Sequence, residues 1–157
     1  KVSALRQGGG ETRVDSQMIL DHLDEIVGPE RALTPADGSE RRDVLRCSAV
    51  ALGLSEKVVG LNFETKQRPA ETIDAGVITR LETQVTSALG WLEERKPDPW
   101  FCGPQMTQAD VTAAASLTHL FERRSELFPG DDYPALAALR ERAEALPHFQ
   151  ASPFPAD

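Results

Sequence analysis

The sequence has few of the features that mark several large classes of protein. Its 157 residues include two cysteines, three histidines and one tyrosine, and the formal net charge is −8. The acidic excess, with no compensating basic stripe, argues against a nucleic acid or an anionic membrane surface as a partner, because both would be repelled. No apolar run approaches the ~20 residues that span a bilayer, and no charged-then-apolar leader is present. We therefore expect no membrane association and a cytoplasmic location.

The cysteines and histidines form no pattern typical of catalysis or metal binding. Cys47 and Cys102 are far apart and lack C-x-x-C or Cys/His spacing, which argues against a disulfide framework, a zinc site or a redox pair. We expect both to be buried free thiols. His22, His119 and His148 have no partner at metal or triad spacing, so we expect packing or solvent contact and predict no metal site.

The remaining composition is that of a folded domain, and the first residues favour a β-hairpin followed by a helix. Hydrophobic residues make up 40% of the chain and charged residues 27%, enough for one sizeable core. Residues 2–6 and 12–14 are short β-type runs, and the glycines between them favour an antiparallel turn. Asp15 or Ser16 then caps a helix that runs to about Ile26. We place a first domain at residues 1–28 and a polar linker at residues 29–39.

From residue 40 onward, apolar residues recur every three or four positions, which predicts helices. The first has apolar residues on two sides and must therefore contact two neighbours. Thr107 and Asp110 form a capping-box pattern before the third helix, and Pro147, Pro153 and Pro155 predict an extended tail. We expect a second, all-helical domain at residues 40–157. Its predicted helices cover residues 40–65, 70–95, 109–122 and 134–146.

Four motifs together are typical of one protein family. They are V-x-A-L with a glycine turn at residues 2–10, V-D-S-x-x-I-x-x-H-L at 14–23, W-F-C-G-P-x-M-T-x-A-D-V at 100–111 and L-x-A-L-x-x-R-x-x-x-L-P-x-F at 136–149. In this order the chain resembles cytosolic glutathione transferases over its whole length, bacterial ones especially. The resemblance implies a thioredoxin-like domain that binds glutathione and a helical domain that supplies the second-substrate pocket and much of the dimer contact. The expected fold is mainly α: a remnant of the thioredoxin-like α/β domain, a β-hairpin plus helix, followed by an all-helical bundle.

The resemblance also implies which residues bind glutathione. The backbone of Val2 would pair with the cysteinyl part of the peptide by β-augmentation. The Ser16 hydroxyl and amide, at a helix N-terminus, suit the γ-glutamyl carboxylate, and the Asp15 carboxylate suits the ammonium. Lys1 is the expected partner of the glycyl carboxylate. Helix capping is the structural role of Asp15 and Ser16, and it does not exclude contact with a ligand.

Ser3 departs from the family pattern. Family members have a proline here, and its cis peptide bond turns the preceding backbone toward glutathione. A cis bond costs ~2.5 to 4 kcal/mol before serine but only ~0.5 to 1 kcal/mol before proline, so the trans form is favoured unless the fold enforces cis. Either the site keeps the cis bond at a cost in stability, or the polar groups of Val2 no longer point outward and glutathione binding is weakened. A sequence error at Ser3 is the third alternative.

The first long helix supplies candidates for the second-substrate pocket. Arg41, Leu45, Ser48 and Leu52 lie on its second stripe, and Phe63 extends this set. The same stripe could instead form a dimer seam. The expected partners are therefore glutathione as co-substrate, a hydrophobic electrophile and a second copy of the chain.

We assign no catalytic residue in this sequence. The family activates the glutathione thiol with a Tyr, Ser or Cys near the start of the N-terminal domain, in a segment expected upstream of this sequence. Tyr133 is expected to pack in the core or cap the last helix. Two functions remain: an enzyme that conjugates or otherwise uses the glutathione thiol on an electrophile, and a non-catalytic transferase-fold module for binding or assembly. The ability to bind glutathione separates them.

Overall fold

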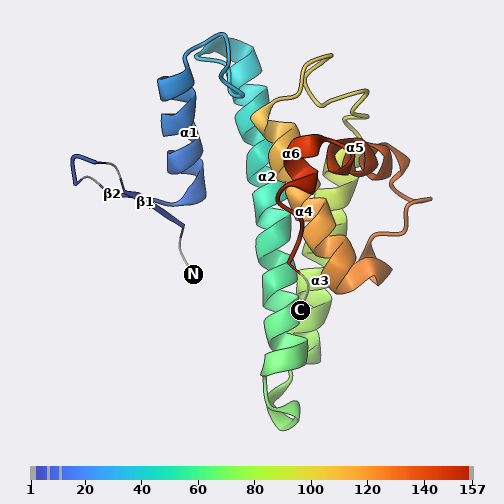
Figure 1. Cartoon of the computed structure of the whole chain (residues 1–157). Helices are drawn as coiled ribbons and strands as arrows, with labels where there is room; N and C mark the ends of the chain where they lie inside the picture. The colour runs from blue at the N-terminus through green and yellow to red at the C-terminus, as the bar shows by residue number, and fades with distance from the viewer. Residues whose placement is uncertain (1–2, 7, 11, 156–157) are drawn as a thin grey trace. The chain divides into compact units, whose positions relative to one another are not determined.

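The computed structural model describes residues 3–6, 8–10 and 12–155. The chain divides into two compact units, Lys1–Arg42 and Asp43–Asp157. In the first unit, strands β1 (Ala4–Arg6) and β2 (Thr12–Val14) form an antiparallel hairpin in which Ala4 pairs with Val14, and helix α1 (Ser16–Val27) follows (Figure 1). The predicted hairpin and helix are confirmed.

Helix α1 begins and ends at the residues that its sequence favours. The Asp15 carboxylate accepts a hydrogen bond from the Gln17 N–H at 2.9 Å, and Gly28, with φ 78°, ends the helix. No residue of α1 is buried, and Met18 and Ile26 are 61% and 60% exposed. The helix therefore presents apolar side chains that no described residue covers.

The segment after α1 is folded back onto it. The Asp24 carboxylate accepts hydrogen bonds from the N–H groups of Leu33, at 2.8 Å, and Thr34, at 3.1 Å, and Thr34 is buried. Because these two residues belong to the predicted linker, part of that segment is anchored to α1. The domain boundaries at residues 28 and 39 stay a prediction.

The second unit is helical, which confirms the mainly α fold class. Helix α2 (Gly38–Asn62) carries the chain into this unit and continues as a π-helical turn, η1 (Phe63–Gln67). In Figure 1, α2 and α3 are long rods, and α4 packs against the short α5. The remaining elements are η2 (Ala70–Thr72), α3 (Ala75–Glu93), α4 (Gln108–Arg124), η3 (Ser125–Leu127), α5 (Pro134–Glu144) and α6 (Pro147–Gln150).

Two predicted boundaries are wrong for identifiable reasons. The helix expected from residue 70 begins at Ala75, because the Asp74 carboxylate caps it by accepting from the N–H groups of Gly76, at 2.8 Å, and Val77, at 3.3 Å. The tail expected to be extended from Pro147 instead begins with the short helix α6. A proline is well tolerated at the first position of a helix, where its missing N–H is not needed.

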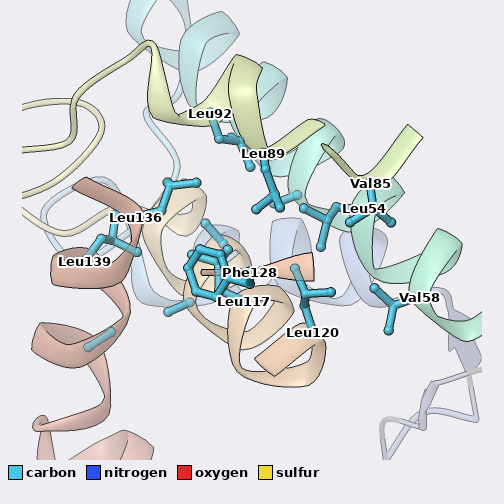
Figure 2. Packing of buried hydrophobic residues seen from close by; sticks show 14 of the residues in the cluster. Leu54, Val58, Val85, Leu89, Leu92, Leu117, Leu120, Phe128, Leu136 and Leu139 are labelled. Atoms are coloured by element: carbon cyan, nitrogen blue, oxygen red, sulfur yellow. The ribbon is translucent and has the colours of Figure 1, made fainter. Parts of the chain in front are cut away.

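The core of the second unit is built mainly from aliphatic side chains three or four positions apart on each helix. Helix α4 contributes small residues, including the buried Ala113 and Ala114, so its neighbours can approach it closely. Figure 2 shows side chains of this core, from α2, α3, α4 and α5, pointing toward one another. Its largest members, each at most 1% exposed, are Leu54, Leu61, Leu89, Leu92, Leu117, Leu120, Leu136 and Leu139.

Within the part of the chain that the structure describes, no helix has both the length and the apolar character needed to cross a membrane.

Candidate functional site

The hairpin brings three of the predicted glutathione-binding residues together. The N–H of Asp15 donates to the carbonyl of Ser3 at 3.0 Å, and Ser16 is the first residue of α1. Ser3 and Asp15 are exposed and Ser16 is half-buried. Lys1 and Val2, and with Val2 the peptide bond before Ser3, lie outside the described residues.

Asp15 has an uncommon backbone conformation. Its φ is 75° and its ψ is 134°, a region that costs residues other than glycine about 1–3 kcal/mol. One carboxylate oxygen, Oδ1, accepts from the Gln17 N–H. No described residue donates to the other oxygen, Oδ2, so this oxygen is available to a ligand.

The Asp15 carboxylate and the N-terminus of α1 together suit a ligand group that carries one positive and one negative charge. The helix dipole makes the N-terminus of α1 favourable for an anion, and beyond the Asp15 cap the first turn of α1 has no acidic residue. The Asp15 carboxylate beside it favours a cation. An α-amino acid group, with its carboxylate and ammonium on one carbon, matches this arrangement.

The predicted second-substrate residues do not line one common cavity. Arg41 donates to Asp21 Oδ1 at 2.9 Å and to the Pro35 carbonyl at 3.1 Å, and with Asp21 it lines a cavity of about 400 Å³ in the first unit.

The other three belong to the second unit. Leu45 is 39% exposed and Leu52 is half-buried, whereas Ser48 is 1% exposed and its buried hydroxyl makes no hydrogen bond to a described residue. Of these three, only Leu45 and Leu52 present appreciable surface. Phe63, on the π-helical turn, is 50% exposed. Whether these residues contact a substrate stays a prediction.

A different cavity, also of about 400 Å³, lies at the C-terminal end of α2 within the second unit. The sequence did not predict this cavity, because its residues come from α2, the π-helical turn and α4. One signal could have found it: Leu45, Leu52 and Val59 follow one another at intervals of seven, so the predicted stripe continues to Val59. The residues that line this cavity are Val59, Asn62, Lys66, Gln67 and Arg123.

A polar and aromatic cluster adjoins Arg123. Ser55 Oγ and His119 Nδ1 are 2.9 Å apart, and the His119 ring stacks on Phe154 with centroids 5.8 Å apart. The Arg123 guanidinium lies 5.1 Å from the centroid of the same Phe154 ring. Desolvation, and then the charge of Arg123, lower the pKa of His119, so the imidazole is neutral at pH 7. No described carboxylate orients this ring, so the pair lacks the third group of a triad.

The described residues include no cysteine or tyrosine with a lowered pKa. Desolvation raises the pKa of Cys47; desolvation and then the charge of Cys47 raise that of Cys102 to about 11. Cys47 is buried but Cys102 is exposed, so the expectation of two buried thiols is wrong for Cys102. Desolvation and then Asp132 raise the pKa of Tyr133, whose ring stacks on Phe128. Among the residues described, no cluster of potential ligands could hold a metal ion.

The predicted capping pair has a structural role. The fully buried Asp110 accepts hydrogen bonds at Oδ2 from the N–H, at 2.7 Å, and the hydroxyl, at 2.8 Å, of Thr107. Its Oδ1 accepts from the N–H of Phe101 at 2.7 Å. One carboxylate thus fixes both the start of α4 and the loop before it.

Comparison with known proteins adds independent observations. The family model described as "Glutathione S-transferase, C-terminal domain" matches residues 61–147. No curated protein sequence matches the chain.

Several solved structures are similar. A glutathione transferase family member from Pseudomonas fluorescens Pf-5, with bound S-(propanoic acid)-glutathione, is 30% identical, with a TM-score of 0.89 over 99% of this chain and 78% of that one. A glutathione S-transferase from Methylobacterium radiotolerans, in complex with glutathione sulfonate, is 27% identical, with a TM-score of 0.89 over 100% and 74%. One from Methylobacillus flagellatus with glutathione bound is 25% identical, with a TM-score of 0.88 over 96% and 74%.

Proposed function

This chain belongs to the glutathione S-transferase family, and from that premise we propose that it binds glutathione and uses the thiol on an electrophilic small molecule. The observation that carries the proposal is the grouping of Ser3, Asp15 and Ser16 at one end of the hairpin. The relatives from Pseudomonas fluorescens, Methylobacterium radiotolerans and Methylobacillus flagellatus hold glutathione or a derivative of it.

In this proposal the γ-glutamyl end of glutathione lies across the start of α1. Its ammonium contacts Asp15 Oδ2, the oxygen that no described residue uses, and its carboxylate accepts from the hydroxyl or N–H of Ser16. Val2 and Lys1 are proposed, from the family resemblance alone, to bind the cysteinyl backbone and the glycyl carboxylate.

The reaction is the transfer of the glutathione sulfur to carbon. The thiol loses its proton to solvent, and the thiolate forms a C–S bond with an electrophilic carbon. If the carbon carries a leaving group, that group departs with the electron pair of its bond. If the carbon belongs to a carbon–carbon double bond, the π electron pair moves toward the neighbouring carbon, which then takes up a proton from solvent. The S-(propanoic acid)-glutathione held by the Pseudomonas fluorescens relative contains such a C–S bond, which supports this chemistry. We assign thiolate stabilisation to none of the described residues, because their thiols and Tyr133 have raised pKa values.

Calorimetric titration of glutathione tests the binding step, with Asp15→Asn as the informative variant. Asparagine tolerates positive φ and still caps a helix, but it lacks the charge. We expect glutathione to bind the natural chain, and the variant to bind about 10- to 150-fold more weakly, since a hydrogen bond to a charged group is worth about 1.5–3 kcal/mol.

Asp37→Asn is the matched control, because Asp37 is also exposed in the first unit and makes no hydrogen bond to a described residue. Ser3→Pro restores the proline that the family has at this position. We expect this variant to bind glutathione more tightly, which tests whether residue 3 limits binding. Equal affinity of the natural chain and Asp15→Asn would reject the assignment of Asp15. Absence of binding by both the natural chain and Ser3→Pro would reject the proposal.

A second function is favoured by Ser3, which stands where the family has proline. In that alternative the protein is a transferase-fold module that binds or assembles without catalysis. Mass spectrometry can detect the adduct of glutathione and chlorodinitrobenzene. A protein that binds glutathione but forms no such adduct would favour the module over the enzyme.

We also propose that the protein is a cytoplasmic homodimer, as the family resemblance implies. Sedimentation equilibrium tests the dimer: a single species with the mass of one chain would reject it.

A further inference from the structure

The last described residues, 151–155, follow α6 and form no helix or strand; we call them the tail segment. The segment turns away from α6 through two hydrogen bonds: the N–H of Ala151 donates to the Pro147 carbonyl at 2.9 Å, and the N–H of Ser152 to the Phe149 carbonyl at 3.0 Å. Beyond Ser152 its backbone makes no hydrogen bond to a described residue. Its attachment to the second unit therefore depends on side chains.

One side chain of the tail segment is anchored on α4. Phe154 is half-buried, whereas residues 151–153 and Pro155 are exposed. The Phe154 ring stacks on His119 with centroids 5.8 Å apart and planes at 21°, and the Arg123 guanidinium lies 5.1 Å from its centroid. His119 and Arg123 are four residues apart and share one side of α4. Within the described part of the chain, the segment thus rests on α4 through one aromatic ring.

A half-buried ring is a weak anchor. The apolar surface that it buries favours docking, and so does the attraction between its face and a guanidinium. The ordering of the segment opposes docking, because each fixed residue loses conformational entropy. These contributions are of similar size for so short a segment. A change in the charge of one group that faces the ring can therefore shift the balance between a docked and a released segment.

His119 is the group facing the ring that can change its charge near neutral pH. Its Nδ1 lies 2.9 Å from Ser55 Oγ of α2. The hydroxyl can donate to a neutral imidazole or accept from a protonated one, so this hydrogen bond holds the ring in both charge states. Phe154 packs on the face of the imidazole and keeps water from it. Docking therefore disfavours the protonated form, which needs that water.

The charged surroundings of His119 act in the same direction. Desolvation, and then the charge of Arg123, lower the pKa of His119. Of the charged groups described on α2, α4 and the tail segment, Arg123 is the one whose charge acts on this imidazole. Ser55 of α2 is uncharged, and residues 151–155 include no titratable side chain. A protonated imidazole is also attracted to an aromatic face, which would act in the opposite direction, so the sign of the pH dependence is a test.

We propose that the tail segment is a pH-dependent strap, docked on α4 through Phe154 while His119 is neutral and released when His119 takes up a proton. The released state binds this proton more tightly than the docked state. Docking is therefore strongest above about pH 6.5 and weakens as the pH falls below that value. Because Arg123 also lines the cavity at the end of α2, release removes the ring on which one lining residue of that cavity rests.

Backbone relaxation of ¹⁵N-labelled protein measures the order of the segment. Phe154 is the reporter, since the prolines on either side of it have no N–H. We expect its order parameter to be about 0.85, as in rigid backbone, at pH 8 and below about 0.6 at pH 5.5. His119→Asn keeps a hydrogen-bonding group beside Ser55 but cannot be protonated, so the order of Phe154 should be the same at both pH values. His148→Asn, at an exposed residue of α6, is the matched control and should respond as the natural chain does.

The reciprocal effect supplies a second measurement. Phe154→Ala removes the ring that excludes water, so the pKa of His119, followed by the chemical shifts of its ring protons, should rise toward 6.5. A rise of one unit corresponds to docking that is about tenfold weaker when His119 is protonated. Phe121→Ala removes another phenyl ring from the surface of α4 and should leave the titration of His119 unchanged.

Thermal melts at both pH values show that each variant is folded. Equal order of Phe154 at pH 8 and pH 5.5 in the natural chain would overturn the proposal. Greater order at pH 5.5 would also overturn it, because the attraction between a protonated imidazole and the ring would then prevail. A pH response that persists in His119→Asn, or a titration of His119 that Phe154→Ala does not change, would reject the role of this pair. None of these measurements requires glutathione, so the proposed function and this inference can fail separately.

Discussion

Replacement of Asp110 by alanine should destabilise the protein more than an ordinary loss of a helix cap. The carboxylate is fully buried and accepts three hydrogen bonds, from the N–H of Phe101 and from the N–H and hydroxyl of Thr107. Alanine removes all three acceptor contacts at once. The two N–H groups remain without a partner, while the Thr107 hydroxyl can rotate to another.

The magnitude follows from these contacts. A lost N-terminal cap costs about 1 kcal/mol, and each of the two half-buried N–H groups left without an acceptor costs about 1–2 kcal/mol, the lower part of the range for a buried group. The free energy of unfolding should therefore fall by about 3–5 kcal/mol in Asp110→Ala. Asp110→Asn should lose less, about 1–3 kcal/mol, because its amide keeps one acceptor oxygen but turns an N–H group toward one of the two backbone donors.

Urea unfolding followed by circular dichroism measures these losses. With a slope of about 1–3 kcal/mol per molar urea, Asp110→Ala should lower the midpoint by about 1–5 M at an unchanged slope. Asp131→Asn, at an exposed residue, is the control and should change stability by less than about 0.5 kcal/mol. A loss below about 1 kcal/mol in Asp110→Ala would refute the view that this carboxylate ties the loop to α4.

Three further results are expected. Leu117→Ala should lower the free energy of unfolding by about 2–5 kcal/mol in the same urea assay, because the side chain is fully buried in the core and its loss leaves a cavity. Desolvation and then the charge of Arg123 lower the pKa of His119 in the folded protein, so the unfolded chain is protonated at this residue first as the pH falls. The free energy of unfolding should therefore decline below about pH 6.5. In thermal melts at a series of pH values, His119→Asn should remove that part of the decline. Cys102, whose pKa is raised from 9.0 to about 11, should hold about a hundredfold less thiolate at pH 8 than an ordinary thiol, and iodoacetamide labelling of the peptide that contains Cys102, followed by mass spectrometry, should be slow until the pH approaches 11.

The elements that could be predicted are those in which local chemistry and the fold agree. The hairpin, α1 and the long helices follow from glycine turns, the Asp15 cap and apolar residues three or four positions apart. Their residues make contacts mostly within one element or with the next one.

The features that could not be predicted depend on hydrogen-bond partners that belong to a different element. The start of α3 moves to Ala75 partly because Glu64, ten residues before Asp74, accepts from the Asp74 N–H. The exposure of Cys102 depends on how the loop at Phe101 is tied to Asp110. No periodic pattern records such contacts.

The candidate functional residues also include some that could be predicted from the sequence and some that could not. Ser3, Asp15 and Ser16 could be grouped from the sequence, because a hairpin places its two ends together. The cavity lined by Lys66 and Arg123 could not, because it needs both a π-helical turn and the approach of a second helix.

Glutathione is proposed to bind at the end of the hairpin. A titration of ¹⁵N-labelled protein with glutathione, followed by amide chemical shifts, locates the binding site residue by residue. We expect saturable shifts at Ser3, Asp15, Ser16 and Gln17 at micromolar to millimolar glutathione. No shifts at millimolar glutathione, or shifts confined to residues of the second unit, would contradict it.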